Sequence, residues 1–159
     1  MKKGELAGQI FVYIVTIILI GMVLLYGYRA IDSFRKRSEE VSYLKFKTEL
    51  ESAVKLTASD YGSVKREAFD VSGGYQGVCF VDLDNINVNS NKDIAEYPLI
   101  KDSIAGGVKD WNVYFPNMEA DPFYIGKIYV QGGFLCLPAT SGKLTIRIEG
   151  RGDRAVISA

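Results

Sequence analysis

The chain has 159 residues, and its 19 Lys and Arg residues balance 19 Asp and Glu residues. This neutrality, with no long basic stripe, lacks the electrostatic footprint of a nucleic-acid binder, so we expect no nucleic-acid partner. The sequence contains no histidine, which removes the commonest general base, the commonest transition-metal ligand and the usual partner of a Ser or Cys nucleophile. We therefore expect a protein that is not an enzyme and that uses neither a metal nor a cofactor.

The first predicted element is an uncharged run over residues 10–28, "IFVYIVTIILIGMVLLYGY". As a helix these nineteen residues would extend about 28 Å, close to the roughly 30 Å of a bilayer's hydrocarbon core. Twelve of them are Ile, Leu, Val or Phe, which favour insertion by roughly 4 to 7 kcal/mol in total. A conventional secretory signal would have a shorter apolar run and a small-residue cleavage site. The sequence therefore predicts a single membrane span in contact with lipid.

The residues before this run, "KKGELAGQ", place a basic pair and a glycine ahead of the apolar segment. This pattern resembles the class III (prepilin) signal of type IV pilins, particularly archaeal ones. Lys3 and Gly4 match the residues before the family's cleavage site, and Glu5 and Leu6 match those after it. The resemblance implies that residues 1–4 are a leader that is cut off after Gly4, on the cytoplasmic side, while the apolar helix is retained.

Cleavage there would make Gln9 the fifth residue of the mature chain. Many bacterial type IV pilins have a glutamate at that position, which contacts the N-terminus of a neighbouring subunit, and the neutral Gln9 departs from this pattern. The resemblance further implies self-association through the N-terminal helix, a prepilin peptidase and a pilus assembly machinery as partners, and a structural role in a pilus-like or pseudopilin filament or secretion system at the cell surface. It covers about the first 60 residues, and the rest of the chain is not assigned to any characterised family.

The charges around the span give a conflicting indication of membrane orientation. Lys2, Lys3 and the amino terminus precede the span, whereas Arg29, Arg35, Lys36 and Arg37 follow it. Positive-inside counting thus favours a cytoplasmic C-terminal domain, and a pilin requires an extracellular one. We expect an extracellular domain, because the leader match is positional. The charged stretch that contains these residues, 29–40, is expected to be a solvated helix with mutual ion pairs, or else a contact with another subunit or with lipid headgroups.

The helix is predicted to continue beyond the membrane over residues 5–60. No proline precedes Pro98, and no glycine lies between Gly27 and Gly62, so nothing in this stretch breaks a helix. Its later turns carry an apolar stripe at helical spacing that needs a sheet to cover it. The stripe consists of Tyr43, Phe46, Leu50, Ala53, Val54 and Thr57, with Lys45, Lys47, Glu49, Glu51 and Lys55 on the other side.

Residues 61–159 read as a β-rich globular head. Seven short runs rich in Val, Ile, Phe and Tyr are separated by Gly, Pro, Asn and Asp clusters, and a short helix is expected near Pro98. Gly150 and Gly152 are expected to supply the turn of a hairpin in "IEGRGDRAVIS". The predicted fold class is α+β: a long helix packed on an antiparallel sheet, as in pilins.

The two cysteines, Cys79 and Cys136, both lie in strand-like strings. If the head faces an oxidising space they form a disulfide, which would contribute about 4 kcal/mol to stability. If it does not, they are buried free thiols. The sequence leaves both alternatives open.

Two further motifs are weak. "DLDNINVNSNKD" begins with Asp82 and Asp84 at EF-hand-like spacing but lacks the Gly and Glu that an EF-hand needs, so an exposed loop is the better interpretation. The "RGD" tripeptide at residues 151–153 is expected to be a hairpin turn and not an adhesion motif.

Two other functions stay open: an uncleaved single-span protein with a β-rich binding or sensing domain, and a membrane-tethered enzyme relying on carboxylates such as Asp82, Asp84 or Asp153.

Overall fold

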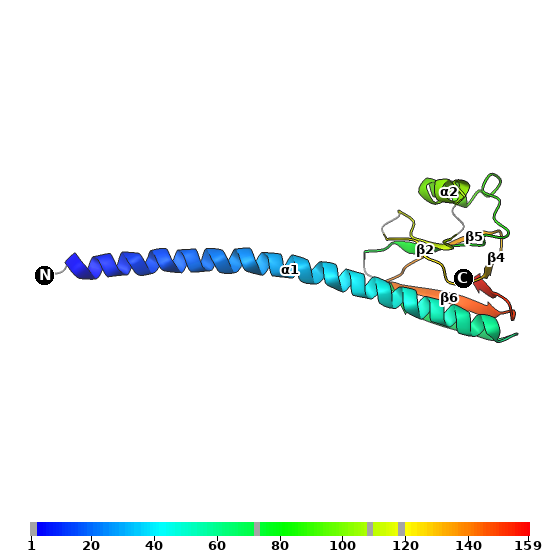
Figure 1. Cartoon of the computed structure of the whole chain (residues 1–159), viewed down its shortest axis with the longest axis horizontal. Coiled ribbons are helices and arrows are strands. Elements are labelled where there is room, and N and C mark those ends of the chain that lie inside the picture. The colour runs from blue at the N-terminus through cyan, green and yellow to red at the C-terminus, as the bar shows by residue number, and fades with distance from the viewer. Residues whose placement is uncertain (1–2, 72–73, 108–109, 118–119) are drawn as a thin grey trace. The chain divides into compact units, whose positions relative to one another are not determined.

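The computed structural model describes residues 3–71, 74–107, 110–117 and 120–159, with the side chains of residues 3–9 outside the description (Figure 1). The chain divides into two compact units, Met1–Val41 and Ser42–Ala159. It belongs to the α+β class: one long N-terminal helix carries the apolar segment, and the second unit contains two β-sheets.

Helix α1 spans Lys3–Ser59, so the predicted uninterrupted helix is confirmed and begins two residues before its expected start. The helix ends at Ser59, and three residues later Gly62 adopts the left-handed conformation, with φ of 81°, which glycine enters without steric cost. The last turn is closed by the rest of the head, because the backbone N–H of Gly152 donates a hydrogen bond of 2.8 Å to the carbonyl of Ala58. A free carbonyl at the helix end is satisfied in this way.

The apolar stripe of α1 is the centre of the head. Phe46, Leu50, Val54 and Thr57 are buried, and Tyr43 and Ala53 are half-buried against them, as the helical spacing predicted. The opposite side is exposed except at Lys47. Its ammonium lies 5.5 Å from the centre of the Phe123 ring, a cation–π contact that draws the side chain onto the head.

The first sheet has four strands in the order β1 (Val64–Asp70), β6 (Lys143–Gly150), β7 (Ala155–Ser158) and β4 (Ile128–Val130). β6 pairs antiparallel with both β1 and β7, whereas β4 runs parallel to β7. The predicted antiparallel sheet is therefore confirmed in part, because among the strand pairings of the described residues only the β4–β7 pairing is parallel. β4 reaches its partner through a connection that includes β5 and β6, and such a crossover permits parallel pairing.

The second sheet has three strands in the order β3 (Val113–Tyr114), β2 (Gly77–Val81) and β5 (Phe134–Pro138). Every residue of β2 is buried, because the strand is covered on both faces. Val78 and Phe80 join the main core with α1, and Cys79 and Val81 join a second core. The predicted helix near Pro98 is α2 (Pro98–Ala105), preceded by the short 3-10 helix η1 (Ile94–Glu96).

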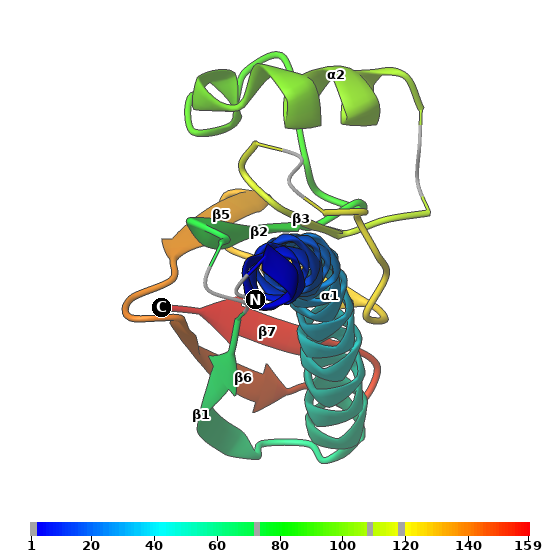
Figure 2. The same cartoon turned by 90° about the vertical axis from the view of Figure 1, so that its left-hand side faces the viewer.

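The head is therefore layered. The main core joins α1 to the inner faces of both sheets, and the second core lies between β2 and the η1–α2 segment. Figure 2 shows α2 on the side of β2, β3 and β5 that is turned away from β6 and β7. The outer face of the four-stranded sheet and the η1–α2 segment are consequently two separate outer surfaces of the head.

Candidate functional site

Residues 10–28 of the first unit form a continuous exposed apolar surface. All twelve of its Ile, Leu, Val and Phe side chains are exposed, and the least exposed of them, Val15, is still 37 % accessible. The helix is long and apolar enough to cross a membrane. A contiguous apolar surface of this size is not stable in water and requires lipid or another apolar surface to cover it.

The charged stretch after this surface carries two ion pairs at i,i+4 spacing. The Nζ of Lys36 lies 2.9 Å from Asp32, and the Nε of Arg35 lies 3.2 Å from Glu39. The predicted solvated helix with mutual ion pairs is confirmed on this point. Because all four side chains are at least half exposed, each pair contributes only about 0.3–0.5 kcal/mol to helix stability.

The residues matched to a prepilin signal lie at the start of α1. Lys3, Gly4, Glu5, Leu6 and Gln9 have helical backbone, and their side chains fall outside the described part of the structure. Neither leader processing nor the subunit contact of Gln9 is tested by this geometry. Both remain predictions.

Cys79 and Cys136 lie directly opposite each other on β2 and β5 and are joined as a disulfide. Cys79 is completely buried, and Cys136 is half-buried at its side. The second core covers the bond with Ile94 and Ile100 from the η1–α2 segment. The bond therefore joins two strands of one sheet beneath a helical cover.

The asparagine-rich loop after β2 uses its polar side chains to shape its own backbone. Asp82 is 1 % exposed, and its Oδ1 accepts hydrogen bonds from the backbone N–H groups of Asp84 (3.1 Å) and Asn85 (3.2 Å). Asn91 accepts from the N–H of Asp93 (2.9 Å) and donates to the carbonyl of Gly132 (2.7 Å). These are Asx-type turns. Among the described residues, no three Asp, Glu or Cys side chains are grouped to hold a metal ion.

A cleft of about 350 Å³ lies beside this loop, lined by residues that include Asp82, Asp84, Asn112 and Lys127. Asn112 is buried, and both ends of its amide are occupied, because Oδ1 accepts from the N–H of Ile125 (3.0 Å) and Nδ2 donates to Gly126 (2.7 Å). The buried polar groups of the cleft thus hold the chain in place, and the exposed charges of Asp84 and Lys127 lie at its surface.

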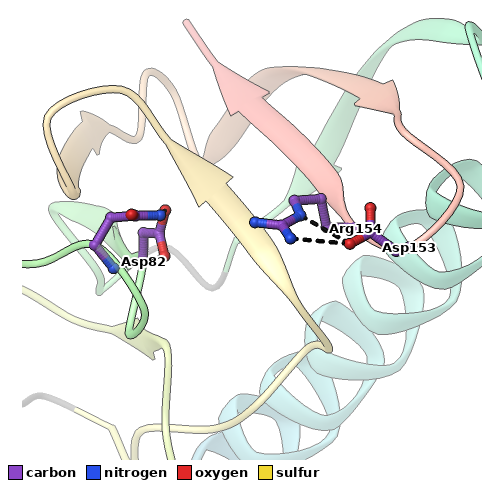
Figure 3. Close-up of polar contacts among 4 residues, drawn as sticks. Asp82, Asp153 and Arg154 are labelled. Carbon is purple, nitrogen blue, oxygen red and sulfur yellow. Dashed lines mark hydrogen bonds and ion pairs between the residues drawn. The ribbon is translucent and has the colours of Figure 1, made fainter.

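The RGD tripeptide lies in the exposed turn between β6 and β7, where Gly152 has φ of 89°. Arg151 is 3.1 Å from Glu149, and Asp153 is 2.9 Å from Arg154. The hydrogen bond from Arg154 holds the pKa of the Asp153 carboxyl below its usual range. Figure 3 shows the guanidinium of Arg154 between Asp153, its partner, and Asp82. Both charged ends of the tripeptide are therefore already paired within the head.

Comparison with protein families, curated proteins and solved structures finds no match for this chain.

Sequence reasoning missed one feature that the strand register creates. Arg66 of β1 and Arg147 of β6 are direct cross-strand partners, and both are exposed on the outer face of the four-stranded sheet. The two residues lie far apart in the sequence, so no local pattern could have joined them.

Proposed function

We propose that this protein is a type IV pilin-like structural subunit, anchored in the membrane by its N-terminal helix and displaying its β-rich head outside the cell. The observation that carries the proposal is that two parts of one helix have different surroundings. The turns at residues 10–28 expose only apolar or uncharged side chains, and the turns around Phe46, Leu50 and Val54 form the centre of the head. A membrane anchor and the spine of a folded head are thus the same element.

The proposed mechanism is exchange of lipid contacts for protein contacts. In the bilayer, lipid covers the apolar turns of each copy. When copies associate, these turns bury against one another, and close packing replaces the lipid contacts. Cleavage after Gly4 would remove Lys2 and Lys3 with the leader. Their positive charges hold this end of the helix at the cytoplasmic face, so their loss makes it easier for the helix to leave the membrane.

The Cys79–Cys136 disulfide supports a head outside the cytoplasm, because disulfides persist mainly in oxidising compartments.

A second function is favoured by the charges after the span: an uncleaved single-span protein with a binding or sensing head on the cytoplasmic side. Arg29, Arg35, Lys36 and Arg37 are the observation behind it. The two proposals differ in the mature N-terminus and in the side of the membrane that the head occupies.

Both differences are measurable in the native host. Mass spectrometry of the purified protein is expected to show a chain that begins at Glu5. Substitution Gly4→Leu is expected to leave the N-terminus uncut, and the matched control Gly8→Ala is expected to be processed normally. A tag after Ala159 should be removed by protease added to intact cells. An intact Met1–Gly4 end, or tag loss only after lysis, would reject the pilin-like proposal.

A further inference from the structure

The outer face of the four-stranded sheet carries a pair of like charges that the fold leaves uncompensated. Arg66 and Arg147 are directly opposite each other on antiparallel strands. Side chains in this relation have Cβ atoms about 4.5–5.5 Å apart, and like charges so placed destabilise the pair. A repulsive pair on an exposed surface therefore needs a reason outside the strand pairing.

The other charges of this face are neutralised within the head. Lys143 lies 3.8 Å from Asp70, and Arg151 lies 3.1 Å from Glu149. Within the part of the chain that the structure describes, neither Arg66 nor Arg147 takes part in an ion pair. The register thus places two exposed arginines opposite each other, and each guanidinium group is suited to bidentate binding of a carboxylate.

The complementary charge is on another surface of the same head. Residues 82–102, which include η1 and most of α2, contain five carboxylates against two lysines. We call this stretch the acidic segment. Four of its carboxylates are exposed, those of Asp84, Asp93, Glu96 and Asp102. The exposed charge of the acidic segment is therefore opposite in sign to that of Arg66 and Arg147.

We propose that the Arg66–Arg147 face of one copy binds the acidic segment of a second copy. The contact joins two different surfaces, so it is heterologous and can repeat along a chain of copies without closing. The inference rests on the self-association in the proposed function, but it concerns a contact between heads and not the contact between apolar helices.

Anchoring in the membrane favours the acidic segment of a second copy over a free anion as the partner of the Arg66–Arg147 face. Copies held in one membrane through the same end of the chain enter an assembly in the same orientation, so each head meets a neighbour with the same charge distribution. Contact between two Arg66–Arg147 faces would bring four positive charges together, whereas contact with the acidic segment pairs opposite charges. The contact should weaken as salt is raised, because exposed charges are screened.

A charge-swap experiment tests the contact in the full-length chain. Donor and acceptor fluorophores are attached after Ala159, and energy transfer between copies is measured in liposomes of neutral phosphatidylcholine. One variant combines Arg66→Glu with Arg147→Glu, and the other combines Asp93→Lys with Glu96→Lys. The control Lys45→Glu with Lys55→Glu is matched to the arginine variant, because it makes the same change in charge at exposed positions of α1.

Each swapped variant alone is expected to associate about tenfold more weakly than the natural chain, because like charges face each other at the contact. A mixture of the two should regain energy transfer, since the acidic face of the first meets the basic segment of the second. The control should behave as the natural chain does.

Three results would overturn the proposal. The first is that both swapped variants associate as strongly as the natural chain, and the second is that mixing them does not restore energy transfer. The third is association that requires anionic phosphatidylglycerol vesicles and is lost only in the arginine variant. The last result would make lipid headgroups the occupant. The proposed function is tested separately, by the mass of the mature N-terminus. A head contact that fails the charge-swap test would therefore not overturn the proposed function, and the two failures can be told apart.

Discussion

Gly150, the last residue of β6, packs directly against the backbone of Thr57 in the final turn of α1. A Cβ atom at Gly150 would overlap the carbonyl oxygens of Thr57 and Asp60. Gly150 also donates a 2.9 Å hydrogen bond to the carbonyl of Ser63 and accepts one of 2.9 Å from the N–H of Gly62. The hairpin and the end of the helix are therefore fixed to each other through backbone atoms.

Substitution Gly150→Ala is expected to lower the free energy of unfolding by about 1–3 kcal/mol, because the added methyl group overpacks a contact made by backbone. Denaturant unfolding of the full-length chain in detergent measures it. Gly74→Ala is the matched control, since a Cβ atom there meets nothing within 4 Å. Equal stability of the two variants would contradict the close approach.

Reduction of the Cys79–Cys136 disulfide is expected to destabilise the head. The bond joins residues 57 positions apart, and the chain-entropy model gives about 4 kcal/mol for a loop of that length. Unfolding should be compared with and without a phosphine reductant. A variant with Cys79→Ala and Cys136→Ala should be less stable than the natural chain, and the reductant should not change its free energy of unfolding. If the reductant also leaves the free energy of unfolding of the natural chain unchanged, the bond is absent.

Two tyrosines predict alkaline destabilisation. Burial raises the pKa of Tyr43, with added repulsion from Asp121 and Tyr75, and burial also raises the pKa of Tyr114, against an opposing effect of the Ser103 hydroxyl. Between the ordinary tyrosine pKa of about 10 and the higher folded values, the unfolded chain loses protons that the folded chain retains. The free energy of unfolding should therefore fall as pH rises through this window, and the tyrosines should contribute no pH dependence well below it.

Unfolding measured between pH 9 and pH 11 checks this slope. Tyr43→Phe and Tyr114→Phe should each flatten it, although Tyr43→Phe also removes a 2.7 Å hydrogen bond to the carbonyl of Asp121 and lowers stability at neutral pH. The slope is therefore the informative readout. Tyr61→Phe, at a side chain that is 77 % exposed, controls for loss of a hydroxyl. Unchanged slopes in both Tyr43→Phe and Tyr114→Phe would disprove the assignment.

Substitution Leu19→Arg, at the middle of residues 10–28, is expected to remove about half or more of the free energy that favours insertion and so to lower the fraction of the protein retained in membranes. Arginine at a helix centre costs roughly 2.5–3.5 kcal/mol on insertion, and the lost leucine removes about another 0.5 kcal/mol of favourable energy. Carbonate extraction of membranes measures retention. Tyr28→Arg places the same charge at the end of the segment and should be retained, because arginine there can reach the interface. Equal retention of Leu19→Arg and Tyr28→Arg would argue against a membrane span.

Much of the fold was predictable from local pattern. The 3.6-residue spacing of Phe46, Leu50 and Val54 predicted the buried face of α1. In one of the seven strand-like runs, Leu144, Ile146 and Ile148 alternate with polar residues, and this pattern indicates the inner face of β6. Each signal lies within one element, where backbone geometry fixes which side chains share a face. Gly150 shows the limit of such reasoning, because it was predicted to be a turn residue and is instead a point of close approach to the helix.

The sequence by itself determined an apolar helix able to span a membrane, its continuation into the head, and most of the strands, because hydrophobicity and periodicity are written in neighbouring residues. Tertiary structure alone decided which distant residues meet: Cys79 with Cys136, Gly150 with Thr57, Arg66 with Arg147, and β4 parallel to β7. These pairings depend on strand register and crossover, which packing of the whole core selects and no short stretch of sequence encodes.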